Sequence, residues 1–332
     1  MKEYDFIAIG DIVTDAFINL DEKFEKVEGV TGHPGYNLCI PFGDKIPYES
    51  VEIVRAVGNS ANAAVSAARL GLKSALSSNI GDDTNGKECL ETLEKEHVAT
   101  EFVKVNQGKI TNYHYVLWYG DDRTILVKHQ NYDHLLPNFG SPKWLYLSSL
   151  GEHTLEYHKE IAEYLKQHPE VSLAFQPGTY QMMFGKEALK DIYNQTKILF
   201  CNIEEAGRIL GITTLGTEEL LKRMFELGPK IIVLTDGAKG AYAYDGKEMW
   251  FVPPYPDIAP PVERTGAGDA FASTTVSALA MGKDLPTALS WGAINSMSVV
   301  QEVGAQKGLL GKEKIENYLA SAPAEFKARK LN

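Results

Sequence analysis

The sequence predicts an α/β fold of three layers, in which helices cover both faces of a Rossmann-like, mostly parallel sheet, with a small β-sheet lid beside it. Three observations carry this prediction. Short apolar runs recur along the chain, helix-forming stretches follow several of them, and two stretches rich in glycine, proline or aromatic residues interrupt the alternation. Strands that are covered on both faces form continuous apolar runs, so these runs indicate a parallel sheet between two helical layers.

The elements of the main domain follow one another in a regular order. A strand is predicted from Phe6 to Gly10, and the alanine-rich stretch from Asn62 to Leu70 has the spacing of a close-packed helix that stops at Gly71. A second strand, Ser74 to Ile80, follows at once. Similar apolar runs predict further strands at Trp144–Ser148, Ser172–Phe175, Ile198–Cys201 and Ile231–Thr235. We assign residues 1–15, 53–100 and 134–332 to one α/β domain.

Residues 16–52 and 101–133 break this order. The first stretch is rich in turn-forming residues, namely Gly29, Gly32, Pro34, Gly35, Pro41, Gly43 and Pro47. The second has alternating aromatic residues, and Gly120-Asp121-Asp122 reads as the turn between two antiparallel strands. We assign both stretches to the small β lid.

Composition limits the classes of partner. The chain has 332 residues, of which 44% are apolar, so it can bury a large core without disulfides. Its 33 Lys and Arg against 44 Asp and Glu give a net charge of −11, which disfavours a nucleic acid or an anionic membrane as the main partner. The start lacks the long apolar region of a signal peptide, and no apolar stretch reaches membrane-spanning length, so a cytoplasmic location is expected.

The segment with the strongest chemical character runs from Thr265 to Asp269, where a glycine-rich turn leads into an alanine-rich helical stretch. Glycines let the backbone approach an anion closely, and the unpaired N–H groups of a helix start point toward it. A carboxylate beside such an anion hole suits a base that accepts a proton from a hydroxyl while that oxygen attacks a phosphorus atom. This pattern predicts an ATP-dependent kinase for small molecules. The alternative is structural: a tight turn followed by an acid that the helix dipole favours.

On these residues, the sequence resembles the PfkB carbohydrate kinase family, also called ribokinase-like, whose C-terminal signature is Asp-Thr-x-Gly-Ala-Gly-Asp before a helix. Other segments resemble further family motifs in the same order along the chain. They are Gly10-Asp11 with Asp15, Val57-Gly58-Asn59-Ser60-Ala61-Asn62, Ile80-Gly81-Asp82-Asp83, Cys201-Asn202-Ile203-Glu204-Glu205, Thr235-Asp236-Gly237 and Gly304-Ala305-Gln306. The resemblance covers nearly the whole chain and is weakest in the lid.

The resemblance implies a ribokinase-like fold and a role for each matching residue. Asp269 would be the catalytic base, and Gly266, Ala267 and Gly268 would form the anion hole. The residues implied to bind the substrate are Asp15, Gly58, Asn59 and Asn62. Those implied to bind ATP are Asn202, Glu205, Thr235, Gly237, Thr265 and Asn295, and Arg264 is added as a candidate because of its charge.

Several of these residues also have structural explanations. Glu205 would help to place Mg²⁺ through water, which suits a hard cation that keeps its water ligands. Read alone, Asn202 and Glu205 are equally well a helix cap and a first-turn acid. Asn295 lies in an apolar helical stretch, where a core amide with satisfied hydrogen bonds is the stronger interpretation.

Two positions depart from the family signature, because Glu263 stands in place of Asp and Arg264 in place of Thr. In many relatives this region helps to hold a monovalent cation, so Glu263 and Thr265 are candidate K⁺ ligands and the departures leave K⁺ activation open. One hypothesis is that Arg264 contacts a phosphate or replaces part of the cation's charge. The alternative is an arginine that faces solvent and pairs with Glu263 or another acid.

The acceptor is not fixed by the sequence. A neutral sugar and a nucleoside are close competitors, because Tyr113, Tyr115, Trp118 and Tyr119 could stack on a base or pair across strands. A phosphorylated sugar is a further candidate acceptor, because the lid carries the cations Lys104, Lys109, Arg123 and Lys128. Lid strands in this architecture often pair between subunits, which predicts a homodimer.

Two other classes fit less well. A nucleotide-binding oxidoreductase would carry G-x-G-x-x-G after its first strand, and this sequence lacks that motif. A non-catalytic sugar-binding protein on the same fold would not need Asp269 and the glycines beside it.

Overall fold

A sheet of ten strands forms the centre of the computed structural model, which describes residues 3–21, 26–29, 36–120, 122–212 and 214–331. The strand order is β16-β15-β14-β13-β12-β11-β10-β1-β6-β7, and the run from β13 to β7 is parallel. The strands are β1 (Phe6–Ile9), β6 (Ser74–Gly81), β7 (Ala99–Asn106), β10 (Trp144–Leu147), β11 (Ser172–Phe175), β12 (Thr196–Asn202), β13 (Ile231–Thr235), β14 (Ala241–Tyr244), β15 (Met249–Val252) and β16 (Arg329–Leu331). The parallel sheet expected from the apolar runs is confirmed.

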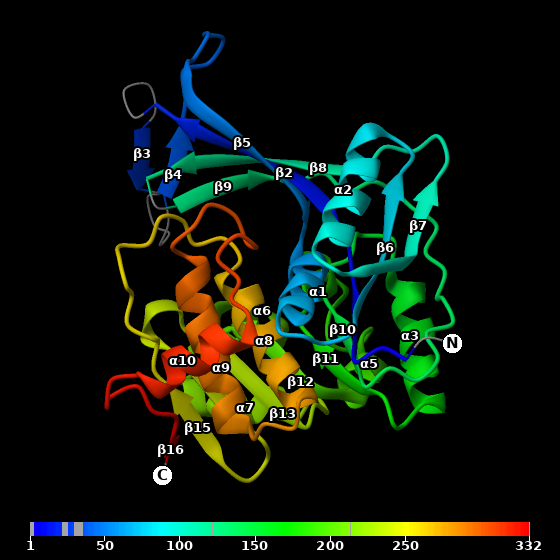
Figure 1. The fold of residues 1–332 in the computed structure, drawn as a ribbon, viewed down its shortest axis with the longest axis vertical. Coiled ribbons are helices and arrows are strands. Elements are labelled where there is room, and N and C mark those ends of the chain that lie inside the picture. The colour runs from blue at the N-terminus through cyan, green and yellow to red at the C-terminus, as the bar shows by residue number, and fades with distance from the viewer. Residues whose placement is uncertain (1–2, 22–25, 30–35, 121, 213, 332) are drawn as a thin grey trace.

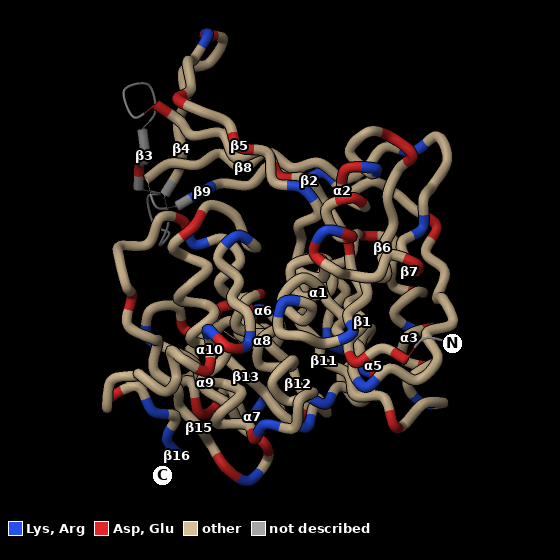
Figure 2. The backbone as a smooth tube through the Cα atoms, viewed as in Figure 1, with Lys and Arg blue, Asp and Glu red and all other residues tan. Residues whose placement is uncertain are grey.

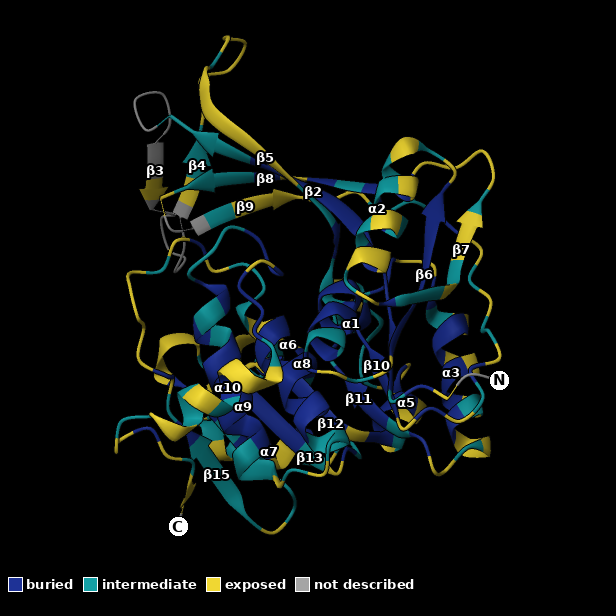
Figure 3. Ribbon diagram, in the orientation of Figure 1, coloured by how far each residue is buried: buried dark blue, intermediate teal, exposed yellow. Residues whose placement is uncertain are grey.

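Helices cover both faces of this sheet (Figure 1). Side chains of β1 alternate between two cores: Phe6 and Ala8 pack into one, and Ile7 and Ile9 into the other. The first core is closed by α1 (Asn59–Arg69), α2 (Thr84–Lys95), α8 (Ala267–Ala280), α9 (Leu285–Val299) and α10 (Lys312–Ala320). The second is closed by α3 (Leu155–Gln167), α4 (Thr179–Phe184), α5 (Lys190–Gln195), α6 (Ile203–Leu210) and α7 (Thr217–Phe225). The central strands β1, β6 and β10 are buried between these layers, whereas β7 and β15 toward the edges are partly exposed (Figure 3), which confirms the three-layer fold.

A second sheet has four strands in the order β5-β2-β8-β9 and stands at the top of the view in Figure 1. It consists of β2 (Val13–Leu20), β5 (Tyr48–Val57), β8 (Asn112–Tyr119) and β9 (Asp122–Leu126). The pairing of β8 with β9 is antiparallel, as the sequence predicts. A further pair, β3 (Lys26–Gly29) with β4 (Tyr36–Cys39), lies beside it.

The bounds of the lid stay a proposal. Four of the turn residues that predict the lid lie outside the described residues, namely Gly32, Pro34, Gly35 and Asp121. The strand β7, which includes residues 101–106, pairs with β6 in the large sheet.

Acidic and basic residues are interspersed along the chain (Figure 2). In the part of the chain that is described, no helix is both long enough and apolar enough to cross a membrane.

Candidate active site

A cavity of about 550 Å³ lies where the carboxyl ends of the parallel strands meet the four-stranded sheet. Ligands of open α/β sheets bind at this end of the strands. Most of the predicted site residues line this cavity, namely Asp15, Gly58, Asn59, Asn62, Asn202, Glu205, Thr235, Arg264, Thr265, Gly266, Gly268 and Asp269. The fold therefore brings together residues that are distant in sequence.

Asp269 lies in the first turn of α8, and only 8% of its surface is exposed. Three side-chain amides donate hydrogen bonds to its carboxylate. Asn59 Nδ2 and Gln176 Nε2 donate to Oδ1 over 2.7 and 3.0 Å, and Asn62 Nδ2 donates to Oδ2 over 2.8 Å. Asn59 and Asn62, which the resemblance assigned to the substrate, thus hold the carboxylate of Asp269 in this structure.

Two of these amides, those of Asn62 and Gln176, are fixed in orientation because their own oxygen atoms accept hydrogen bonds. Gln306 Nε2 donates to Asn62 Oδ1 over 3.0 Å and to the carbonyl of Ala56 over 2.7 Å. The hydroxyl of the buried Tyr146 donates to Gln176 Oε1. Because each amide oxygen accepts a hydrogen bond, the N–H groups of Asn62 and Gln176 face Asp269.

Burial raises the pKa of the Asp269 carboxyl above its ordinary value, although hydrogen bonds from Asn62, Asn59 and Gln176 and the charge of Arg123 act in the opposite direction. A base must be deprotonated to act, so activity that depends on Asp269 falls as the pH drops through this raised pKa.

Removing one amide donor is expected to raise the pKa of Asp269 further. In a Gln176→Ala variant, the acid limb of the profile of kcat/KM against pH should therefore move to higher pH. Gln167→Ala is a matched control, because Gln167 donates to the exposed carboxylate of Glu163 over the same 3.0 Å. An acid limb that stays in place, or moves equally in the control, would contradict this role for Gln176.

The turn before α8 requires glycine at Gly266, which caps the helix with a φ of +81°. A Cβ at this position would lie 2.5 Å from the Cα of Ala305. Beyond the turn, the first N–H groups of α8 have no acceptor within the helix. A Cβ at Gly268 would meet no atom within 4 Å, so the backbone is open to the cavity there.

A second glycine, Gly58, shapes the opposite wall of the larger cavity. Gly58 precedes α1 with a φ of +105°, and a Cβ there would lie 2.7 Å from the carbonyl oxygen of Asp11. The hydroxyl of Ser60 donates to the same carbonyl over 3.0 Å. The start of α1 is thereby packed against the segment that follows β1.

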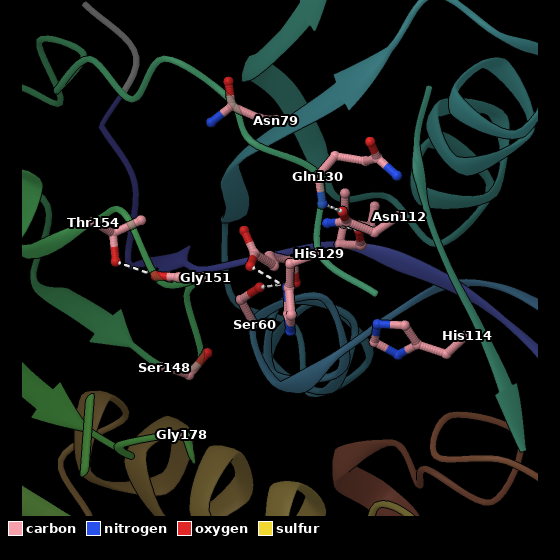
Figure 4. Close-up of polar contacts among 12 residues, drawn as sticks. Ser60, Asn79, Asn112, His114, His129, Gln130, Ser148, Gly151, Thr154 and Gly178 are labelled. Carbon is pink, nitrogen blue, oxygen red and sulfur yellow. Dashed lines mark hydrogen bonds and ion pairs between the residues drawn. The ribbon is translucent and has the colours of Figure 1, made fainter. Parts of the chain in front are cut away.

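Two carboxylates on this wall each lie beside an imidazole. Asp11 Oδ2 is 2.8 Å from His129 Nδ1, and Asp15 Oδ1 is 3.5 Å from His114 Nδ1. The centroids of the two histidine rings are 5.6 Å apart, and Figure 4 shows both beside α1. Among the described residues, His114 Nε2 is buried without a hydrogen-bond partner. The wall thus offers donors and acceptors to a ligand with hydroxyl groups.

Asn202 and Glu205 line the cavity and also cap α6. The backbone N–H of Glu205 donates to Asn202 Oδ1, and that of Asn202 donates to Glu205 Oε2, each over 2.8 Å. Burial raises the pKa of the Glu205 carboxyl above its ordinary value. The helix cap therefore occupies one carboxylate oxygen of Glu205.

A second cavity, of about 410 Å³, lies against the first and is lined by Gly237 and Ala267. Its lining is largely apolar beyond the start of α8 and includes Val252, Pro253, Pro254, Tyr255, Ala293 and Met297. Asn295 lines neither cavity. It is fully buried, donates to Thr274 Oγ1 over 2.6 Å and accepts from the N–H of Leu310 over 2.9 Å, so it is a core amide in this structure.

The residues that line the larger cavity but were not among the predicted site residues include His114, Arg123, His129 and Gln176. His114 reaches the site because β8 pairs with β2 in the register that sets it opposite Asp15. Side chains of a strand alternate between its two faces, so Tyr113 and Tyr115 point away from the cavity when His114 points into it. This alternation was a signal in the sequence that could have indicated His114. The positions of Arg123 and Gln176 carried no motif that would reveal them.

Comparisons with known proteins bear on the fold and the family of the chain. The model of the family described as "pfkB family carbohydrate kinase" matches residues 48–311. An ATP-dependent 6-phosphofructokinase of Thermoanaerobacterium thermosaccharolyticum is 26% identical over 328 residues, covering 92% of this chain and 90% of the relative.

Solved structures show the same fold. A nucleoside kinase of Methanocaldococcus jannaschii has a TM-score of 0.74 at 21% identity, with 97% of this chain and 100% of that chain covered. A putative ribokinase II of E. coli in complex with ATP and Mg²⁺ has a TM-score of 0.76 at 19% identity, with 96% and 99% covered. The chain belongs to the PfkB family of carbohydrate kinases, and it is a phosphotransferase with an alcohol group as acceptor, of the carbohydrate or nucleoside kinase kind.

Proposed function

We propose that the protein transfers the γ-phosphoryl group of ATP to a hydroxyl of a sugar, with Asp269 as the general base and the backbone of Gly266, Ala267 and Gly268 as the anion hole. One observation carries the proposal: the two cavities meet at the start of α8, where Gly268 lines both of them. An acceptor in the larger cavity and a nucleotide in the smaller one would therefore face each other across Asp269 and this helix start.

The chemistry follows from this arrangement. The acceptor hydroxyl gives its proton to the carboxylate of Asp269 while its oxygen forms a bond to the γ-phosphorus. The bond from that phosphorus to the β-γ bridging oxygen breaks, and ADP leaves with the electron pair. The N–H groups at the start of α8 stabilise the negative charge on the transferring group.

Glu205 fits a magnesium site that works through water. Mg²⁺ prefers oxygen ligands and keeps several of its waters, and when bound it neutralises charge on the phosphates. Among the described residues, no group of three or more His, Cys, Asp or Glu side chains is arranged to hold a metal ion directly. One carboxylate oxygen of Glu205 accepts from the backbone of Asn202, which leaves the other for a metal-bound water.

Arg264 is exposed and lines both cavities. We therefore assign it to a phosphate of the nucleotide, together with Thr235 and Gly237 at the end of β13. The KM for MgATP of an Arg264→Ala variant measures this contact, and an unchanged value would contradict it.

The lining of the larger cavity favours a sugar as acceptor. Asp11, Asp15, His114 and His129 offer hydrogen bonds, whereas Tyr113, Tyr115, Trp118 and Tyr119 are not part of the lining. Of the four lid cations that kept a sugar phosphate open, only Arg123 lines the cavity.

A nucleoside is the second candidate. The rings of His114, His129 and Tyr180 follow one another with centroids 5.6 and 5.5 Å apart along the cavity wall, which provides aromatic faces for a base.

An ADP-release screen separates these candidates. The purified protein is assayed with MgATP and D-ribose, D-fructose, D-fructose 6-phosphate, adenosine, inosine or cytidine, with Asp269→Asn as the blank. We expect release with a neutral sugar. Release with a nucleoside alone would favour the second candidate, and no release above the blank with any acceptor would contradict the kinase proposal.

A homodimer through the lid remains our proposal. Ile53, Tyr115 and Leu126 share the face of the small sheet opposite His114, and they are 36%, 49% and 51% exposed. Sedimentation velocity should show a dimer, and a single species at the monomer mass would contradict it. The cytoplasmic location likewise stays a prediction.

A further inference from the structure

Glu263 lies in the loop before α8 and is fully buried, with 0% of its surface exposed. Its Oε1 accepts from the backbone N–H of Thr265 over 2.7 Å and from the hydroxyl of the same residue. Among the described residues, its Oε2 has no hydrogen-bond partner. Because Gly266 follows directly and caps α8, the carboxylate of Glu263 holds the turn that leads into the anion hole.

A buried carboxylate is costly unless a positive charge compensates it. Among the residues that the structure describes, Glu263 forms an ion pair with Arg123, whose Nε lies 3.5 Å from Oε1. Arg123 belongs to β9, the edge strand of the small sheet, and it lines the same cavity as Asp269. The ion pair therefore joins the small sheet to the loop that begins α8.

The side chains of this pair are unequal in exposure. That of Arg123 is 25% exposed and that of Glu263 is 0% exposed. If the small sheet moved away from α8, Arg123 would follow β9 into solvent, whereas Glu263 would stay buried with its charge uncompensated. The charge balance of the loop thus depends on where the small sheet lies.

We propose that Arg123 is a positioning residue that pairs with Glu263 to fix the turn from Thr265 to Gly266, so that the anion hole is complete only when the small sheet lies over the site. This inference rests on the proposed function. It assigns to Arg123 the positive charge that K⁺ or Arg264 was expected to supply.

A double-mutant cycle tests the pairing without any acceptor. Thermal unfolding is measured for the native protein, Arg123→Ala, Glu263→Gln and the double variant. We expect Arg123→Ala to lower Tm by roughly 3 °C, because the carboxylate loses its partner. Glu263→Gln has no charge to compensate, so adding Arg123→Ala to it should lower Tm by much less. Equal losses in both backgrounds would overturn the pairing.

Kinetics test the positioning role, with the acceptor from the panel that the native protein phosphorylates. At a pH high enough to keep Asp269 deprotonated in both proteins, Arg123→Ala is expected to lower kcat by about tenfold and to leave the KM for the acceptor unchanged, because the affected group is then the anion hole. Guanidinium ion at millimolar concentration should restore part of kcat. A change in the acceptor KM alone would show instead that Arg123 binds the acceptor, and would overturn the proposal.

Lys128→Ala is the matched control, because it also removes one positive charge just after β9 from an exposed residue that does not line the cavity. Its kcat and Tm should match those of the native protein.

The response to K⁺ is a further test of the proposal. Arg123→Ala should be more active in KCl than in N-methylglucamine chloride, and the native protein should not. An equal K⁺ response in both proteins would contradict the assignment of this charge to Arg123. If the native protein phosphorylates no acceptor, the proposed function fails, but the unfolding cycle still decides the pairing.

Discussion

Replacing Asp269 by asparagine should lower kcat by between about 10²- and 10⁴-fold, which is the range for loss of a positioned general base. Asparagine is nearly the same size as aspartate, but its amide does not accept the proton of the acceptor hydroxyl. The variant should still bind MgATP with native affinity, because the smaller cavity is unchanged. ADP release at saturating acceptor measures kcat, and titration calorimetry with MgADP measures nucleotide binding.

The matched control is Asp284→Asn. Asp284 caps α9 by accepting from the N–H of Thr287 over 3.0 Å and lines neither cavity, and asparagine caps helices equally well. Its kcat should be native. An Asp269→Asn variant that keeps more than a tenth of native kcat would refute Asp269 as the base.

The second large effect is expected for Gly266→Ala. The backbone at Gly266 has a φ of +81°, which strains any residue with a Cβ, and the added methyl would press on Ala305. The turn must shift, so the N–H groups at the start of α8 move away from the transferring phosphoryl group. Loss of such donors lowers kcat by about 10²-fold or more. Together, strain and overpacking should destabilise the fold by about 1–3 kcal/mol.

The control variant Gly282→Ala separates the effect of backbone strain from the effect of moving the turn before α8. Gly282 follows the other end of α8 with a φ of +80°, and a Cβ there would meet no atom within 4 Å. This variant should lose about 1 kcal/mol of stability through strain and keep native kcat. Stability is measured by urea unfolding. If Gly266→Ala matched this control in both stability and kcat, the turn would have no special role.

The core of the fold was predictable because it depends on local patterns. The strands β1 and β10 to β13 are apolar runs with buried centres, and β6 is buried along its length although half of its residues are serine or asparagine; each was predicted within two residues of its observed ends. The antiparallel strands β14, β15 and β16 were not predicted. The strands β14 (Ala-Tyr-Ala-Tyr) and β16 (Arg-Lys-Leu) contain no continuous apolar run, and β15 (Met-Trp-Phe-Val) is apolar but mostly half-buried near the edge of the sheet, where burial imposes a weaker pattern.

The site was predictable where a motif is contiguous. The segment from Thr265 to Asp269 and the residues Asn59 and Asn62 are recognisable in sequence, and they meet in the structure. Gln176 and Arg123 are single residues whose roles arise from tertiary contacts with Asp269 and Glu263. Such contacts depend on how strands and loops are placed in space, which no local pattern encodes.

The three amides around Asp269 have a consequence for which hydroxyl reacts. A carboxylate accepts about four hydrogen bonds, two at each oxygen. Asn59 and Gln176 fill both positions on Oδ1, whereas Asn62 fills one on Oδ2. An acceptor must then approach Oδ2, from a single direction. On the proposed mechanism, the amides that hold Asp269 would therefore limit which hydroxyl of a bound acceptor can reach the base.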